Sequence, residues 1–355
     1  VSRESVEMLT AVSSSIAGKA PVRKPIGLLC DSYFKERFTI GGMVFEFIEA
    51  KSSSDEDWEE WRSSLKGVVG GSDFASLMGH GYTSPRACLK EILGFKQKKP
   101  LNHFAKTCMQ HGKKYEKYVI EVLKQELIIG GFGSRRKNLK VSAVYEFYRE
   151  SDPTGKRLRI CISPDYLEMI GFVVEVKCPY MGSTGEYSDS WEFAEALNAR
   201  YFESRGRESY FLQALFYSAI VHECVIIDDN DYLCGIEAVL TRRVFAVAIG
   251  AVSNEEKLSV VWYPYSLTPK SSDIVWKGLS NILEHSTLSD CERYRITSTQ
   301  RVCVSEQMYT TAIVGFGILR VQYTIDMNGN LLEPETSEEQ CEDSSGDDDP
   351  CPPRE

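Results

Sequence analysis

The sequence predicts an α/β (α+β) fold in which helices flank a mixed central β-sheet. Segments with the 3.6-residue period of a helix alternate along the chain with segments of strand-like alternation, and this interleaving indicates a mixed sheet. The 355 residues are 43% hydrophobic and 26% charged, which is typical of a globular protein with an ample core. We find no internal repeat.

Turn residues and hydrophobic spacing divide the chain into elements. A helix N-cap is expected at Ser72, because Asp73 and an apolar run follow it, and Gly94 should close a helix over residues 84–93. The same spacing predicts further helices at 111–127, 190–222 and 274–283. Strands are expected at 43–47, 139–148, 157–162, 242–252 and 258–265.

We expect a core with three flanking segments. Residues 56–290 hold the patterned core, and residues 1–55 form an N-terminal extension whose role the sequence does not indicate. Residues 291–332 are expected to pack on the core as a C-terminal extension. The Pro- and acid-rich residues 333–355 are expected to form a disordered tail.

The net charge of −10 neither supports nor excludes nucleic-acid binding. The tail holds ten acidic residues and one Arg, so it carries −9 of this charge and leaves the rest of the chain near −1. A polyanion responds to the local field, and basic residues gather locally, although each group could equally be a solvated face. These groups are Lys96, Lys98 and Lys99; Lys113, Lys114 and Lys117; and Arg135, Arg136, Lys137 and Lys140.

The sequence carries no signal for export or for a membrane span. The longest nearly uncharged apolar run, Val244–Val252, is far too short to cross a bilayer, and the first residues lack the order of a secretory signal. Eleven cysteines without a CxxC pair are typical of reduced thiols. We therefore expect an intracellular protein that is not secreted; if the protein is viral, this means the host nucleus or cytoplasm.

Asp165, Glu175 and Lys177 form the constellation that carries chemistry. Residues 163–171 and 172–180 predict a strand pair around a turn near Gly171, which would bring Asp165 beside Glu175. Side chains two apart on a strand face the same way, so Glu175 and Lys177 project together from an otherwise apolar strand. Two carboxylates this close repel one another unless a cation lies between them, and oxygen ligands favour Mg²⁺ or Mn²⁺ over zinc. A metal there would activate a water, and Lys177 would orient that water or stabilise the phosphoryl charge.

A plainer alternative is a Glu–Lys pair on an edge strand, with Asp165 in a turn. An isolated Glu-x-Lys is more often such a pair than a catalytic group, although the Pro164–Asp165 step before the hairpin weighs against it here. Spacing alone leaves both interpretations open. The five histidines show no metal-ligand spacing, and no Walker A loop or GxSxG motif is present.

Four segments, taken in order, resemble one nuclease family. They are GVVGGSDFASLMG at 67–79, HGKKYEKYV at 111–119, CISPDYLEMIGFVVEVKCPY at 161–180 and ESYFLQALFYSAIV at 208–221. Together they resemble the λ-exonuclease-like or YqaJ viral recombinase group, of the viral alkaline exonuclease type, within the PD-(D/E)xK nuclease superfamily. The resemblance covers about residues 58–228, and it implies a restriction-endonuclease-like core and an exonuclease domain over residues 56–290.

The resemblance also implies a set of metal ligands. Asp165 and Glu175, joined by the backbone carbonyl of Val176 and by Glu116 from a helix, would hold two Mg²⁺ (or Mn²⁺) ions, and Lys177 would assist the attacking water. The alternative for Glu116 is an ion pair with a neighbouring lysine on its own helix.

A second implied set would contact phosphate. Ser72, Ser163 and Gln213 resemble the group's contacts to a terminal 5′-phosphate, and Tyr210 resembles the aromatic residue three positions before that Gln. The alternatives are a plain N-cap for Ser72, a satisfied buried amide for Gln213 and a core aromatic for Tyr210. For Tyr217 we favour a place in the core.

One position departs from the family's pattern. The family usually places an Arg four residues after a Trp in the first segment, where it holds the 5′-phosphate; after Trp61 that position is Leu65, with Lys66 next and Arg62 a turn earlier. Lys66 would act as a point charge without the bidentate geometry of Arg. This departure puts the selection of 5′-phosphates in question.

The resemblance implies a Mg²⁺-dependent 5′-to-3′ exonuclease that hydrolyses phosphodiester bonds at double-stranded DNA ends during viral or mobile-element recombination or processing. One alternative is an endonuclease of the same superfamily. Another is a non-catalytic recombination scaffold that binds a single-strand annealing protein. Members of the group often form rings around DNA, so a homo-oligomer and an annealing partner are both expected from the resemblance.

Overall fold

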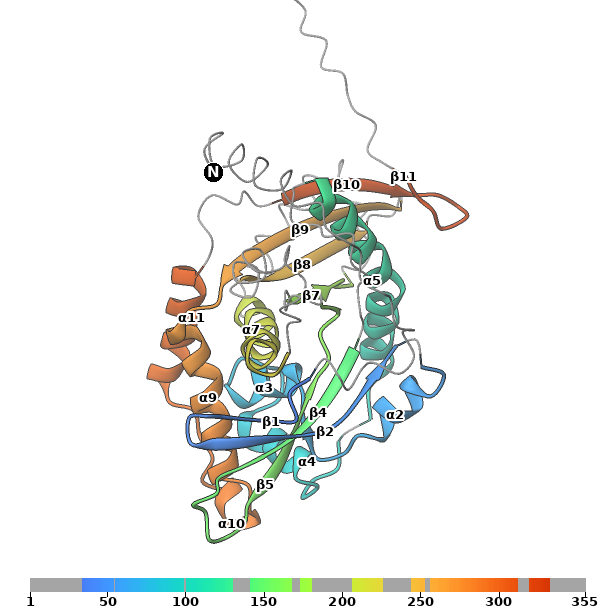
Figure 1. Cartoon of the computed structure of the whole chain (residues 1–355). Coiled ribbons are helices and arrows are strands. Elements are labelled where there is room, and N and C mark those ends of the chain that lie inside the picture. The colour runs from blue at the N-terminus through green and yellow to red at the C-terminus, as the bar shows by residue number, and fades with distance from the viewer. Residues whose placement is uncertain are drawn as a thin grey trace, which may run out of the picture.

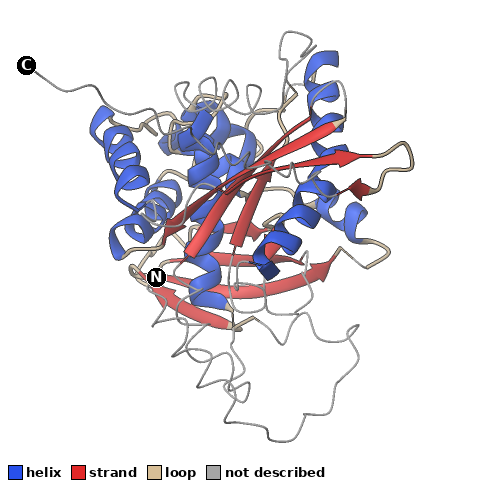
Figure 2. Cartoon of the chain, turned by 90° about the horizontal axis from the view of Figure 1, so that it is seen from above, coloured by secondary structure: helices blue, strands red, loops and turns tan. Residues whose placement is uncertain are grey.

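The computed structural model describes residues 34–53, 55–98, 100–129, 141–167, 173–180, 206–225, 244–252, 256–311 and 319–332. Helices and strands alternate along these segments, which confirms the expected α/β (α+β) class (Figure 1). The strands do not form one central sheet, however. They divide into a sheet of five and a sheet of six, and helices lie on both sides of the strands (Figure 2).

The five-stranded sheet has the order β1(Arg37–Ile40), β2(Met43–Ser52), β4(Val141–Tyr148), β5(Arg157–Ile162), β3(Val68–Val69). The β3–β5 pair is parallel and the other pairs are antiparallel. Gly41 and Gly42 join β1 to β2 with φ angles of +59° and +74°, the left-handed conformation that a tight two-residue hairpin turn requires. The prediction of a strand at 157–162 is confirmed at both ends.

The six-stranded sheet has the order β11(Leu331–Leu332), β10(Leu319–Ile325), β9(Lys257–Ser266), β8(Val244–Val252), β7(Val173–Lys177), β6(Tyr166–Leu167). The predicted strand pair is confirmed, because β6 and β7 are antiparallel with Tyr166 opposite Val174. β7 also pairs in parallel with β8, which places Glu175 beside Val247. β7 therefore has a strand on both sides only at Val173 and Val174, and from Glu175 to Lys177 it pairs with β8 alone.

The described helices are α2(Trp58–Ser64), α3(Gly71–Leu77), α4(Pro85–Ile92), α5(His103–Ile129), α7(Gly206–Cys224), α9(Pro269–Glu284), α10(Leu288–Cys291) and α11(Ser298–Thr311). None of these helices is long and apolar enough to cross a bilayer. Two of them cover the six-stranded sheet: Val173 of β7 packs in a cluster with α7, whereas Val174 and Val176 pack with α5. α5 and α7 thus lie on opposite faces of β7.

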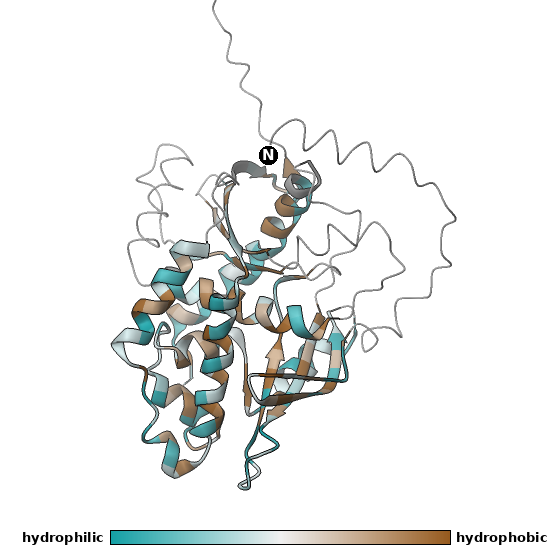
Figure 3. Ribbon diagram, turned by 60° about the vertical axis from the view of Figure 1, so that its left-hand side comes forward, coloured by the Kyte–Doolittle hydropathy of each residue, from teal (hydrophilic) through white to brown (hydrophobic). Residues whose placement is uncertain are grey.

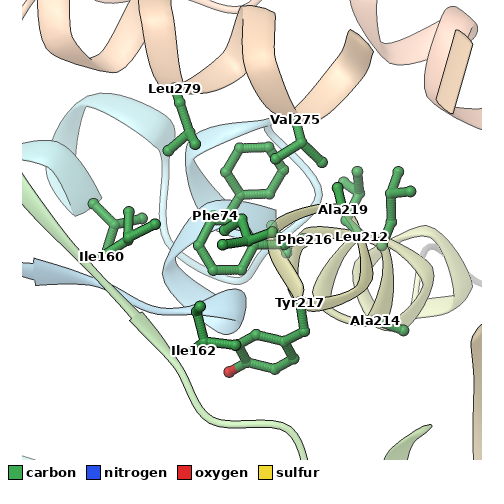
Figure 4. Packing of buried hydrophobic residues seen from close by; sticks show 14 of the residues in the cluster. Phe74, Ile160, Ile162, Leu212, Ala214, Phe216, Tyr217, Ala219, Val275 and Leu279 are labelled. Atoms are coloured by element: carbon green, nitrogen blue, oxygen red, sulfur yellow. The ribbon is translucent and has the colours of Figure 1, made fainter. Parts of the chain in front are cut away.

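The larger core lies between the two sheets and the helices α3, α7 and α9. Phe74 of α3 stacks on Phe216 of α7 with ring centroids 4.9 Å apart, and Val275 and Leu279 of α9 close the cluster (Figure 4). A Cβ atom at Gly278 would lie only 2.8 Å from the Phe74 ring, so a glycine is needed where α9 crosses α3. The helices carry both hydrophobic and hydrophilic residues along their length, as expected for helices that cover a core on one side (Figure 3).

Two expectations about helix starts are wrong. Ser72 is the second residue of α3, and the N-cap is Gly70, whose N–H donates to the Asp73 carboxylate at 3.3 Å. Asp73 is the third helical residue, and its carboxylate stabilises the helix start by accepting this hydrogen bond. The helix expected from residue 111 begins earlier, at His103, and the apolar residues Phe104, Ala105, Cys108 and Met109 already follow the helical spacing there.

Several expectations concern residues that lie outside the described part of the chain. These are the turn near Gly171, the first half of the helical segment 190–222, the acidic tail 333–355, and the basic residues Lys99, Arg135, Arg136, Lys137 and Lys140.

Candidate active site

The candidate active site lies where β7 ends against α7. Alternation along β7 turns Glu175 and Lys177 toward α7, on the same side as Val173. Glu175 is only 4% exposed, and its Oε1 atom accepts a charge-assisted hydrogen bond from Lys177 Nζ at 2.5 Å. The second carboxylate oxygen, Oε2, is buried and has no hydrogen-bond partner among the described residues. An anionic oxygen without a partner in a protein interior is costly, so this atom is available to a ligand that carries positive charge.

Asp165 reaches the same site from the connection between β5 and β6. Its Oδ2 atom accepts a hydrogen bond from the backbone N–H of Val176 at 2.9 Å, so the carboxylate lies against β7. β6 is too short to pair with this part of β7, which leaves the Val176 N–H free for a side chain. The expected return of Asp165 to the side of Glu175 is thus a local consequence of the short hairpin.

The electrostatics of Asp165 show how closely the acidic groups gather. Burial, followed by the charges of Glu175 and Glu116, raises the pKa of the Asp165 carboxyl to about 8, against the opposing effects of Lys177 and the Val176 N–H. A carboxyl held in this state gains from any cation that arrives between it and its neighbours.

Lys177 is the cation already present. Burial would lower the pKa of its ammonium group, but the charges of Glu175 and Asp165 outweigh burial and raise it, so the group stays protonated. The ammonium also lies 5.6 Å from the ring centroid of Tyr210 on α7. A Glu–Lys pair is therefore present, as in the plainer alternative, but Glu175 is buried and the pair lies beside a second carboxylate.

Glu116 approaches Asp165 from α5, on the other face of the sheet. α5 comes unusually close to the strands: a Cβ atom at Gly250 of β8 would lie 2.2 Å from Val119 Cγ2, and one at Gly112 would lie 3.7 Å from the carbonyl oxygen of Cys178. The charge of Glu116 acts on both Asp165 and Cys178, which places it within electrostatic range of the site.

The phosphate-contact candidates are distributed around this centre. Ser163 is buried and accepts a hydrogen bond from Ser142 of β4 at 2.7 Å, a partner that an apolar strand pattern did not suggest. Gln213 is 7% exposed and donates to Ser209 at 3.3 Å on its own helix. Tyr210 lies against Lys177, so this turn of α7 faces the end of β7.

The first-segment candidates lie further out. Ser72 is exposed at the start of α3. Leu65 packs against Trp58 and Trp61, so the position where an Arg was expected contributes to a small apolar cluster instead. Lys66 is exposed, and no contact among the described residues joins it to Glu175 or Asp165. The guanidinium of Arg62 lies 5.1 Å from the Trp58 ring centroid.

Tyr217 links the first segment to the site, a role that its expected place in the core did not include. It is buried, as expected, but its hydroxyl also accepts a hydrogen bond from the N–H of Gly71 at 3.2 Å. Burial raises the pKa of this hydroxyl, and the charges of Glu175 and Asp165 raise it further, so Tyr217 lies between the carboxylates and α3. A Cβ atom at Gly71 would be 2.7 Å from the Tyr217 ring, which explains the glycine.

Replacing Tyr217 with Phe should lower the free energy of unfolding by about 1–3 kcal/mol, because the buried Gly71 N–H loses its acceptor. Urea denaturation monitored by circular dichroism measures the change, with Tyr309→Phe on the exposed face of α11 as the matched control. A midpoint equal to that of the control would show that the hydroxyl contributes nothing to the attachment of α3.

The side chains suit a hard divalent cation, although they do not form a complete metal cage. Within the described ranges, no three His, Cys, Asp or Glu side chains are arranged to hold an ion. The free Oε2 of Glu175 and the mutual repulsion of Asp165 with Glu175 and Glu116 nonetheless fit a group that accepts oxygen ligands and carries positive charge. Ligand binding would require Asp165 and Glu175 to exchange their present hydrogen bonds for metal contacts.

A comparison with known protein families finds one match. Residues 57–221 match the family model described as the YqaJ-like viral recombinase domain. These residues contain α2, α3, α5, β7 and most of α7, and therefore every side chain named at the site. No curated protein and no solved structure matches the chain.

Proposed function

We propose that this chain, whose residues 57–221 match the family model of the YqaJ-like viral recombinase domain, is a Mg²⁺-dependent 5′-to-3′ exonuclease acting on double-stranded DNA ends. Members of that family are generally nucleases with a role in recombination. The observation that carries this proposal is the buried trio of Asp165, Glu175 and Lys177. It combines a free anionic oxygen, a second carboxyl with a raised pKa and a fixed ammonium group. A purely structural ion pair needs only two of these groups.

Metal binding would fall to Asp165 and Glu175, with Glu116 and the carbonyl of Val176 completing the set. When bound, Mg²⁺ would lower the pKa of a water and offset the negative charge that grows on the phosphoryl oxygens. Mn²⁺ would serve equally, since it takes the same oxygen ligands. Glu116 comes from a separate element, so the approach of α5 to the sheet decides how many ligands the site offers.

Lys177 would orient the attacking water relative to the scissile phosphate. Its ammonium stays charged and is fixed between Glu175 and the ring of Tyr210, so little reorientation is needed when substrate arrives. Ser163 and Gln213 offer hydrogen-bond donors nearby, and Ser72 and Lys66 would contact the phosphate at the outer rim. The 5′-phosphate would therefore meet hydroxyl, amide and ammonium donors instead of a bidentate Arg.

Leu65 favours a second candidate function, that of an endonuclease. An exonuclease must recognise a DNA end, and the side chain expected to do so is here committed to packing against Trp58 and Trp61. A site without firm 5′-phosphate contacts would cut within a duplex as readily as at its end.

A comparison of three DNA substrates separates these functions. We expect linear duplex with a 5′-phosphate to be degraded in Mg²⁺ faster than duplex with a 5′-hydroxyl, and covalently closed circles to resist. Circles cut as fast as linear DNA would establish the endonuclease. If no substrate is cleaved and calorimetry detects no Mn²⁺ binding, the chain is a non-catalytic recombination scaffold.

Asp165→Asn should lower the rate of cleavage of every substrate by about a hundredfold or more, because a neutral amide is a poor metal ligand. The folded state should persist, because the substituted amide keeps an oxygen that can accept the Val176 N–H and carries no charge to repel Glu175. Gel assays of nicked and linear products measure the loss, and full activity in this variant would remove Asp165 from the mechanism.

Two partners belong to the same proposal. A single-strand annealing protein would receive the 3′-ended strand that the nuclease leaves, and a ring of identical subunits would keep the enzyme on its DNA. Sedimentation of the purified chain, alone and with DNA, tests the ring.

A further inference from the structure

An unbroken series of aromatic rings runs from the candidate active site along α5. Tyr180, three residues after Lys177, contacts Phe104 and His111 at ring-centroid distances of 6.3 and 5.3 Å. His111 in turn lies 4.7 Å from Tyr115, which lies 6.2 Å from Tyr118. We call these five residues the aromatic strip. α5 lies along the sheet that holds β7 and β8 (Figure 1), so the strip starts where β7 ends.

The outer end of the strip is open to solvent, which a structural role does not explain. Phe104 is 65% exposed and Tyr180 is 38% exposed, so both rings leave a large apolar surface in water. Tyr115 is buried and packs in the core beneath α5. His111 is partly exposed, and its buried Nε2 atom has no hydrogen-bond partner within the described part of the chain. The strip is thus anchored at one end and presents bare ring faces at the other.

Lysines outnumber acidic residues beside the strip. The ammonium of Lys114 lies 4.6 Å from the Tyr115 ring centroid and donates to the Tyr115 hydroxyl at 2.9 Å, and that of Lys117 lies 4.5 Å from the Tyr118 ring centroid. From His103 to Val119, α5 carries four lysines and one acid, Glu116, which acts on Asp165. Ring faces interleaved with lysines are the pattern that binds unpaired nucleic-acid strands, since bases stack on the rings while ammonium groups contact the phosphates.

We propose that the aromatic strip, with Lys114 and Lys117, binds an unpaired DNA strand next to the Asp165–Glu175–Lys177 site, stacking its bases on Phe104 and Tyr180. This assignment deepens the proposed nuclease function and rests on it for the identity of the strand. The surface is continuous with the chemistry, because only Cys178 and Pro179 separate Lys177 from Tyr180. A duplex end would have to open before its bases reach these rings, so the strip favours single-stranded over paired DNA.

Fluorescence anisotropy in EDTA tests this binding without cleavage. The probe is a fluorescein-labelled oligothymidylate of about twenty nucleotides, longer than the ~4–16 nucleotides of a typical single-strand site. We expect the Phe104→Leu/Tyr180→Leu double variant to bind it about tenfold or more weakly than wild type, because leucine keeps the apolar volume but offers no face for stacking. Tyr180→Phe keeps the ring and should bind like wild type.

The matched control is Phe95→Leu/Tyr309→Leu. It removes two exposed rings, one from the turn after α4 and one from α11, and should leave the affinity for oligothymidylate unchanged. Equal affinity of the strip variant and this control overturns the proposal, and so does a wild-type protein that ignores oligothymidylate. Photo-crosslinking of wild type with 5-iodouracil in the probe gives an independent measurement. The adduct should lie on a peptide that contains Phe104 or Tyr180, and an adduct elsewhere counts against the strip.

The outcome is separable from the proposed function. Loss of oligothymidylate binding in the strip variant, in a protein that cleaves no DNA, would retain the strip and reject the nuclease. Cleavage by wild type, with equal oligothymidylate affinity in the strip variant, would reject the strip and retain the nuclease.

Discussion

Replacing Lys177 with Met is expected to lower the rate of DNA cleavage by about a hundredfold or more and to lower the free energy of unfolding by about 2–3 kcal/mol. Cleavage is lost because the substitution removes the ammonium group that is fixed beside Glu175. In the proposed mechanism, negative charge develops on the phosphoryl oxygens at this place. The loss of stability follows because Glu175, which is 4% exposed, loses its hydrogen-bonded ion-pair partner. Breaking a fully buried pair costs about 3–5 kcal/mol, and Lys177 is partly exposed, so we expect less.

A second substitution separates these two effects. Glu175→Gln/Lys177→Met removes both charges and should recover most of the lost stability, since no unpaired ion stays buried. Cleavage should stay absent in the double variant. Rates on linear duplex in Mg²⁺ and urea denaturation of the same preparations give both quantities. If Lys177→Met were as stable as wild type, the ion pair would contribute nothing to folding; if it cleaved DNA normally, Lys177 would have no part in the chemistry.

The trio could be predicted from the sequence because its geometry is local. Two-residue spacing on a strand sets Glu175 and Lys177 on one face, and a short hairpin returns Asp165 to them, whatever the rest of the fold does. The parallel pairing of β7 with β8 could not be predicted, since the two strands are separated by 66 residues of sequence. That pairing is what turns a common surface motif into a buried site.

Contacts between distant segments account for the other differences. The hydrogen bond from Gly71 to Tyr217 joins residues 146 positions apart, and the pattern that marked Tyr217 as a core aromatic carries no information about its hydroxyl. Leu65 shows the opposite case. Its apolar character was visible, but only the structure shows that it packs on Trp58 and Trp61. The division into two sheets likewise depends on which strands pair, a choice that alternation along each strand leaves open.

The approach of α5 to the sheet depends on Gly250, and Gly250→Ala should destabilise the protein by about 1–3 kcal/mol and reduce cleavage. The added methyl would lie 2.2 Å from Val119 Cγ2, so α5 or β8 must shift to admit it. A shift of α5 moves Glu116 relative to Asp165, and the proposed metal site would lose a ligand. Urea denaturation and cleavage in Mg²⁺ measure the two effects on one preparation.

Val119→Ala tests whether the steric clash with Val119 causes these effects, because it removes the methyl group that the new side chain of Gly250→Ala would meet. Alone, Val119→Ala should destabilise the protein through lost packing, since Val119 is fully buried. Combined, the two substitutions add one methyl group at Gly250 and remove two from Val119, including the one that the added methyl would meet. The double variant should therefore be more stable than the sum of the single effects implies, by about 0.5–3 kcal/mol. Cleavage should recover with it. Strict additivity in the double-mutant cycle would show that the α5–β8 contact does not set the position of Glu116, and the site would then depend on β7 and its hairpin alone.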